Sequence, residues 1–69
     1  MINNDVLRSI RYMLDLSDSM VVDTIHLADP SFEVDAAQVH DFLRKDDEPL
    51  FEACPDEVLA RFLDGLIYH

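Results

Sequence analysis

Four short patterns of apolar and capping residues divide the chain, and each predicts the start of a helix. In each pattern an apolar residue precedes a small or capping residue, and a second apolar residue follows four positions after it. This is the spacing of a hydrophobic staple around an N-cap, whose side chain accepts a hydrogen bond from a free backbone N–H. The four sets are Ile2-Asn3-Leu7, Leu16-Ser17-Val21, Val34-Asp35-Val39 and, more weakly, Ala53-Cys54-Val58.

Apolar residues at helical spacing predict how far these helices extend. The capping box formed by Asp35 and Gln38 is the strongest local signal, and Pro30 is expected to end the helix before it. The sequence therefore predicts an all-α fold, a compact bundle of four short helices in one domain over residues 1–69. The expected ranges are about Asn4 to Leu14, Asp18 to Leu27, Ala36 to Arg44, and Cys54-Pro55 to Ile67 or Tyr68.

The same spacing predicts which side chains face the core. Arg8 and Arg11 are expected on the opposite side of the first helix from its apolar stripe, and Leu50 and Phe51 are expected to pack back onto the core. The apolar stripe of the first helix consists of Val6, Leu7, Ile10, Met13 and Leu14. The apolar stripe of the fourth helix consists of Val58, Leu59, Phe62, Leu63 and Leu66.

The chain is strongly acidic. Fifteen Asp and Glu residues oppose five Lys and Arg residues, which gives a net charge of −10 at pH 7 and an isoelectric point near 4.2. Such a surface disfavours attraction to nucleic acid or to an anionic membrane. The charge indicates a solvated surface or, as the alternative, a surface for a basic partner.

The sequence also predicts where the protein resides. A single cysteine excludes an internal disulfide and fits the reducing cytoplasm. Residues 1–5 lack the pattern of a signal peptide, and no apolar run approaches the roughly 20 residues of a membrane span. We therefore expect a cytoplasmic protein without a membrane partner.

The residues that could carry chemistry form no convincing site. Cys54 is the only thiol, but its sequence neighbours are acidic and oppose a thiolate, so a structural role is favoured over a reactive one. The three histidines, His26, His40 and His69, lack the i, i+4 spacing of a helical zinc site. The acidic run at residues 46–48 lacks the alternating ligands and glycine of a calcium loop. No catalytic residue, metal or cofactor is predicted.

Two further features leave alternatives open. The second and third helices suggest a helix-turn-helix, but residues 29–35 make a longer connection than the usual turn, and the third helix presents acidic side chains. Gly65, the only glycine, is placed inside a helix, where it costs about 0.5–1 kcal/mol relative to alanine. It marks either a neutral site or the close approach of another helix, within the domain or across a dimer.

Three stretches of the chain resemble the bacterial DUF1456 (YehS-like) family of unknown function. They are residues 3–16 (NNDVLRSIRYMLDL), 42–49 (FLRKDDEP) and 54–67 (CPDEVLARFLDGLI), in that order. The resemblance implies one copy of a domain that usually occurs twice in tandem and is followed by a basic segment. It implies no functional residues.

The first functional hypothesis is a non-enzymatic helical protein-interaction module that self-associates, as a homodimer or with a second copy of the domain, or binds an unknown protein partner. Such a small core supplies only about 3–5 kcal/mol, so the domain gains from association. The candidate interface comprises Phe62, Gly65, Leu66 and Ile67. The alternatives are a nucleic-acid-associated regulatory domain whose basic segments lie outside this chain, since this chain alone is not expected to bind nucleic acid, and a small thiol-dependent redox protein.

Overall fold

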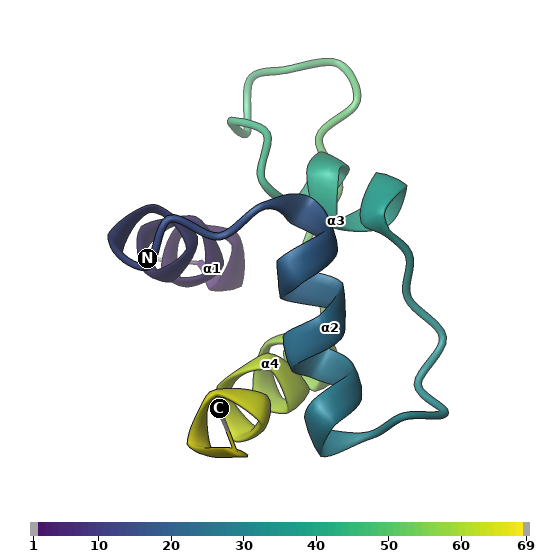
Figure 1. Ribbon diagram of the computed structural model, residues 1–69. Helices are drawn as coiled ribbons and strands as arrows, with labels where there is room; N and C mark the ends of the chain where they lie inside the picture. Colours follow the sequence, from purple (N-terminus) through teal and green to yellow (C-terminus); the bar gives the residue numbers. More distant parts are fainter. Residues whose placement is uncertain (1, 69) are drawn as a thin grey trace.

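The computed structural model describes residues 2–68 and confirms the all-α fold (Figure 1). Its helices are α1 (Asn3–Met13), α2 (Asp18–Ala28), α3 (Ala36–Phe42) and α4 (Asp56–Tyr68). No strand occurs within these described residues, and their overall extents are 33 × 24 × 19 Å. Among the same residues, no helix has both the length and the apolar character needed to cross a membrane.

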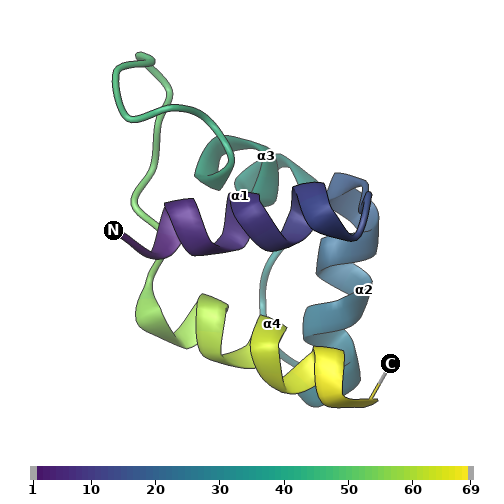
Figure 2. The same cartoon turned by 90° about the vertical axis from the view of Figure 1, so that its left-hand side faces the viewer.

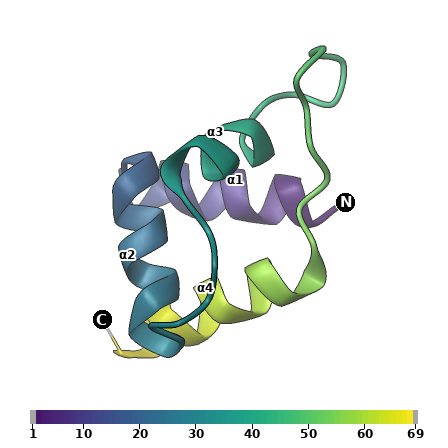
Figure 3. The same ribbon diagram turned by 90° about the vertical axis from the view of Figure 1, so that its right-hand side faces the viewer.

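The helices form a bundle in which α2 crosses the others. Figure 2 shows α1 and α4 running side by side in the same direction, with α2 crossing their carboxyl-terminal ends. In Figure 3, from the opposite side, α3 lies in front of part of α1, and the connection over residues 29–35 rises from the lower end of α2 to α3. Residues 43–55 form a long loop that projects from the end of α3 before returning to α4.

The core is small and draws on every helix. Its largest fully buried side chains come from α1, α2, α3 and α4, so no helix can be removed without opening it. The buried apolar residues are Leu7, Leu16, Val21, Ile25, Val39, Phe42, Cys54, Val58 and Phe62.

Two of the predicted caps are confirmed. The Ser17 hydroxyl accepts a hydrogen bond from Met20 N at 3.2 Å at the start of α2. At the start of α3, Asp35 Oδ1 accepts from Gln38 N at 2.8 Å, and Gln38 Oε1 accepts from Asp35 N at 3.0 Å. This reciprocal pair is the capping box that the sequence predicts.

The prediction that Asn3 caps α1 is wrong. Ile2 occupies the N-cap position, and its backbone N–H donates to Asp5 Oδ2 at 3.1 Å. Asn3 instead donates from Nδ2 to the Cys54 carbonyl at 3.1 Å and to Asp56 Oδ1 at 2.6 Å. A contact between distant segments therefore replaces the local cap at this position.

The bounds of α3 and α4 also differ from expectation. Arg44 lies beyond α3 because its N–H bonds to the Asp41 carbonyl, three residues back, as in a tightened last turn. At the other helix, the Pro55 carbonyl accepts from Val58 and Leu59, so Pro55 precedes α4. Cys54 lies outside the helix.

Several predicted orientations are wrong. Met13 and Leu14 were expected in the core, but they are 73% and 52% exposed because the chain turns away at Asp15, whose φ is 53°. Arg8 and Arg11 do not face solvent opposite the core. They are half-buried: Arg8 donates to the Arg44 carbonyl just beyond α3, and Arg11 lines a pocket with His40 of α3. Leu50 and Phe51 were expected to pack onto the core, but Leu50 is exposed and Phe51 is half-buried.

The crossing of α2 and α4 is the most extensive contact between helices, and it depends on Gly65. A Cβ added at Gly65 would overlap the Thr24 carbonyl oxygen and lie 2.7 Å from its carbonyl carbon. The two backbones therefore touch at this point. Of the alternatives that the sequence left open for Gly65, the structure shows the close approach of a helix within the chain.

A second interaction, made by Arg61, connects the end of α2 to α4. Arg61 Nε donates to Asp29 Oδ2 at 3.1 Å, and its guanidinium lies 4.6 Å from the Phe32 ring centroid. Hydrogen bonds from Arg61, and next from Ser31, hold the pKa of the Asp29 carboxyl below its usual value. Arg61 thus binds the connection between α2 and α3 by both charge and stacking.

Replacement of the capping carboxylate tests the start of α3. Asp35→Ala should lower the free energy of unfolding by about 0.5–2 kcal/mol, the usual range for a lost cap. Asp35→Asn should cost much less, because asparagine also accepts the hydrogen bond. Urea melts of the three proteins measure both effects, and equal losses in the two variants would show that Asp35 is not the cap.

Replacement of the glycine tests the helix crossing. Alanine in a helix normally gains about 0.5–1 kcal/mol over glycine, whereas overpacking costs about 1–3 kcal/mol. Because the Thr24 backbone cannot rotate away as a side chain would, Gly65→Ala should be destabilising in urea melts. Ala60→Gly, at an exposed site of α4, is the control and should cost about 1 kcal/mol. A Gly65→Ala protein more stable than wild type would contradict the close crossing.

Candidate interaction surface

Cys54 is held as a structural residue at the start of α4. It is 5% exposed, and its backbone N–H donates to Asn4 Oδ1 at 2.9 Å. Burial, with a smaller effect from the carboxylate of Asp56, raises the pKa of the Cys54 thiol to about 11. This environment opposes the thiolate that a nucleophile or redox centre needs.

The two described histidines lie apart from each other, and each makes a hydrogen bond with a different group. His26 Nε2 lies 2.9 Å from the Phe32 carbonyl, and His40 Nδ1 lies 3.1 Å from Asp18 Oδ2. Within residues 2–68, no three His, Cys, Asp or Glu side chains are placed to share a metal ion. His69 lies outside the described residues.

The acidic run at residues 46–48 is an exposed loop closed on itself. Glu48 Oε2 accepts from Lys45 N at 2.6 Å, and Glu48 N donates to the Lys45 carbonyl at 3.0 Å. Its residues are exposed. The hydrogen bonds fold the loop as a turn.

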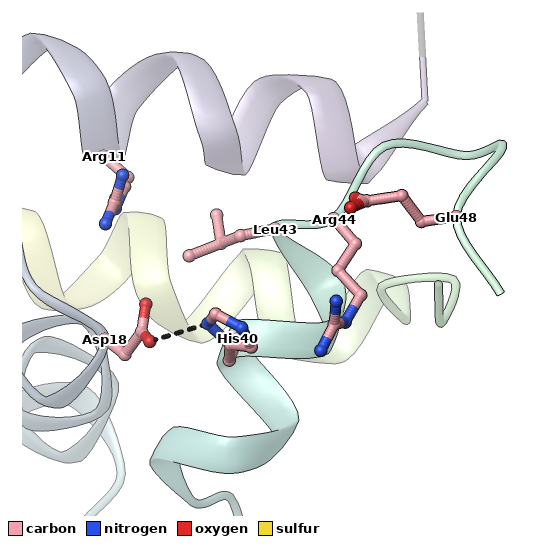
Figure 4. Close-up of a pocket in the computed structure, with 6 residues that line it drawn as sticks. All are labelled: Arg11, Asp18, His40, Leu43, Arg44 and Glu48. Atoms are coloured by element: carbon pink, nitrogen blue, oxygen red, sulfur yellow. Dashed lines mark hydrogen bonds and ion pairs between the residues drawn. The ribbon is translucent and has the colours of Figure 1, made fainter. Parts of the chain in front are cut away.

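A small polar pocket of about 210 Å³ lies where α1, α2 and α3 meet (Figure 4). Asp18 and His40 are joined by a hydrogen bond at its base, and the Arg11 side chain extends from α1 toward them. Two buried atoms there, Arg11 Nε and Asp18 Oδ1, have no hydrogen-bond partner among residues 2–68. The pocket is lined by Arg11, Asp18, His40, Leu43, Arg44 and Glu48.

The polar pocket mixes both signs of charge. Arg44 Nε already donates to Asp41 Oδ1 at 3.0 Å, and Glu48 faces the same space. A ligand there would meet two carboxylates for two guanidinium groups. The pocket therefore has no clear preference for an anion or a cation.

An apolar groove lies on another face, between the carboxyl-terminal ends of α1 and α4, with α2 as its floor. Its larger hollow encloses about 380 Å³ and adjoins a second of about 200 Å³. Leu16, Met20 and Thr24 line both hollows, so they form one continuous surface. We call this surface the apolar groove; its other lining residues are Leu14, Asp23, Leu27 and Leu66.

Local structure explains why these residues share one surface. Asp15 adopts the left-handed conformation, and Leu16 N bonds to the Arg11 carbonyl across the turn, so the chain reverses sharply after α1. On α2, Met20, Thr24 and Leu27 follow the i, i+4, i+7 spacing of one helix face.

Three of the apolar side chains that line the groove are exposed to solvent. Met20 and Leu27 on α2 are 47% and 51% exposed. At the end of α1, Leu14 is 52% exposed, whereas the 81% exposed Ile67 lines a different hollow, with Ala28 and Asp64. Large apolar side chains concentrated at one place on the surface of a small protein are typical of an interaction site.

The charged side chains at the apolar groove are negative. Asp23 lines it, and Asp15 lies between two of its leucines in the turn. Its described lining residues include neither lysine nor arginine. The five cations of the chain lie by α3 or bind the connection after α2: Arg8, Arg11, Arg44, Lys45 and Arg61.

The structure separates the four residues predicted as an interface. Phe62 is fully buried and Gly65 packs against α2, so both serve the chain's own core. Leu66 is half-buried and lines the apolar groove, while Ile67 is exposed. An interface on α4 remains a prediction, and the surface left for it consists of Leu66, Ile67 and the 39% exposed Leu63.

A comparison with known protein families shows to which family the chain belongs. The model of the family described as "Protein of unknown function (DUF1456)" matches residues 3–69. The chain belongs to the DUF1456 family. This confirms the resemblance carried by the three sequence stretches.

A DUF1456 relative is considerably longer than this chain. The chain is 46% identical over 68 residues to the uncharacterized protein YehS of Escherichia coli strain K12. The match covers 99% of the chain but 42% of YehS, so the chain spans about two fifths of the relative's length. No solved structure matches the chain.

The raised pKa of Cys54 predicts slow alkylation. Moving the pKa from 9.0 to about 11 lowers the thiolate fraction at neutral pH, and the higher nucleophilicity of a more basic thiolate offsets only part of this. Iodoacetamide should therefore react with the folded chain at least about tenfold more slowly than with the chain in urea. The folded rate should rise as pH approaches 11. Equal rates at pH 7 would contradict a buried thiol.

Proposed function

We propose that this chain is a non-enzymatic protein-interaction module that binds through the apolar groove. The observation that carries this proposal is the concentration of exposed apolar side chains around a groove that the fold itself leaves open. Burial of an apolar side chain such as Met20 or Leu27 stabilises a complex by about 1.5–3 kcal/mol when the burial is complete. Several such side chains at one place supply the driving force for binding.

A second copy of the domain is one partner for this module. The family resemblance implies tandem copies, and YehS has room for a second one, since 58% of its length lies outside the match. Two chains that each carry a net charge of −10 repel one another, however. We therefore expect weak self-association that depends on ionic strength.

The two alternative functions have less support. For nucleic-acid binding, α3 has only seven residues, and two of the arginines near it, Arg8 and Arg44, are paired with acidic side chains. For a thiol enzyme, the raised pKa of Cys54 opposes catalysis at neutral pH. Neither alternative makes use of the apolar groove.

Light scattering and sedimentation velocity test self-association from sub-micromolar to tens of micromolar chain. The dimer dissociation constant should fall as salt rises, because salt screens the repulsion. Met20→Gln should weaken association about fivefold, since it removes roughly 1 kcal/mol of apolar burial. Glutamine also accepts a hydrogen bond, as Met20 Sδ does from Ser17 N, so α2 should remain capped.

Tyr12→Gln is the matched control for this experiment. Tyr12 is 83% exposed and does not line the groove, so its replacement should leave association unchanged. A wild-type monomer at every concentration and salt would contradict self-association. A dimer that Met20→Gln leaves intact would place the interface outside the groove.

A further inference from the structure

The geometry points to a specific kind of partner: we propose that the apolar groove binds a basic amphipathic helix of another protein. The inference rests on the proposed interaction function and adds the chemistry of the partner to it. It depends on the shape of the groove, on the charges beside it and on the placement of the chain's own cations.

The shape suits the apolar face of a helix. The two hollows, of about 380 and 200 Å³, adjoin and share Leu16, Met20 and Thr24 as lining. Apolar residues three or four apart on a helix lie about 5–6 Å from each other, so successive anchors can enter adjoining hollows. The ends of α1 and α4 flank the groove, as the helices of a receptor flank a bound amphipathic helix.

The lining suits a partner that must fit by adjustment. Met20 lines both hollows and is 47% exposed. Unbranched, polarizable methionine side chains adapt to the shapes of different apolar anchors.

Charge selects the polar face of the partner. Asp23 in the second hollow and Asp15 in the adjacent turn are both exposed, and none of the described lining residues is cationic. Lysine or arginine residues on either side of an apolar stripe would meet these carboxylates. The net charge of −10 would also speed the encounter with a cationic helix.

A second copy of this chain satisfies the charge requirement poorly. The two arginines of its α1 are half-buried, and its other two long helices are acidic: α2 contains Asp18 and Asp23 without lysine or arginine, and α4 contains three acidic residues against Arg61. Each would bring further negative charge to the groove. Binding of a basic helix is favoured both by apolar burial and by charge attraction. Binding of a second copy is favoured by apolar burial but opposed by charge repulsion.

Three synthetic peptides test the proposal by fluorescence anisotropy with the full chain. The first is a fluorescein-labelled helix with leucine at i, i+3, i+4 and i+7 and lysine on its other face. The second keeps the leucines and replaces each lysine by glutamate. The third has the composition of the first in an order without an apolar face. The first should bind at least about tenfold more tightly than either of the others.

Two charge-reversal variants separate the groove from the total charge. Asp23→Lys should weaken binding of the basic peptide about fivefold or more, through lost attraction and added repulsion. Glu33→Lys, at an exposed site in the connection between α2 and α3, changes the net charge equally and should weaken it less than about twofold. Equal effects of the two variants, or equal binding of the reordered peptide, would overturn the proposal in favour of bulk electrostatics.

Amide chemical-shift mapping distinguishes failure of the inference from failure of the proposed function. The basic peptide should shift the amides of Leu14, Met20 and Leu66. If the glutamate peptide or a second copy shifts the same amides at equal or lower concentration, the groove is an interaction surface and the basic-helix proposal is wrong. If no peptide shifts them and the chain stays monomeric, both are wrong.

Discussion

The rest of the structure depends on the contact between the backbones of α2 and α4. Gly65 lies against the Thr24 carbonyl with no room for a Cβ, so the backbones of the two helices are in contact. This crossing brings Val21 and Ile25 of α2 onto Phe62 of α4, and those three side chains are fully buried. A core this small rarely supplies more than about 3–5 kcal/mol, and within residues 2–68 no other helix pair has a comparable contact.

The same crossing creates the apolar groove. Because α4 packs so closely on one side of Thr24, the next side of α2, with Met20 and Leu27, remains at the surface beside the end of α4. The left-handed turn at Asp15 then directs Leu14 outward and Leu16 inward. The groove is therefore a consequence of how the helices cross, and filling it from within would require the Gly65 contact to open.

Features that depend on neighbouring residues could be predicted from the sequence, while those that depend on distant ones could not. The caps at Ser17 and Asp35 use bonds that span three residues, and both are where the pattern indicates. Asn4 has no such local signature, yet its Nδ2 donates to the carbonyls of Phe42 and Glu52, at 2.9 and 2.8 Å. Periodicity likewise placed Leu14 on the apolar stripe of α1, but a stripe does not show which part a partner helix covers. The groove was missed for this reason, although the unusually wide apolar arcs of α1 and α2 were its visible signal.

The hydrogen bonds of Asn4 hold the long loop over residues 43–55 in place in this acidic chain. They also fix the position of Arg44 in that loop. The buried Asn4 amide joins α1 to the end of α3 and to the segment before α4, through neutral hydrogen bonds that salt does not screen. With the loop tied there, Arg44 stays beside α1, where its carbonyl accepts from Arg8 at 3.2 Å. Arg8 and Arg44 are thereby held on the α1–α3 side and paired with Asp5 and Asp41, while Arg61 of α4 is paired with Asp29. The groove on the other side is left with Asp15 and Asp23 alone, so its apolar surface and its negative charge are both open to a partner that supplies their complements.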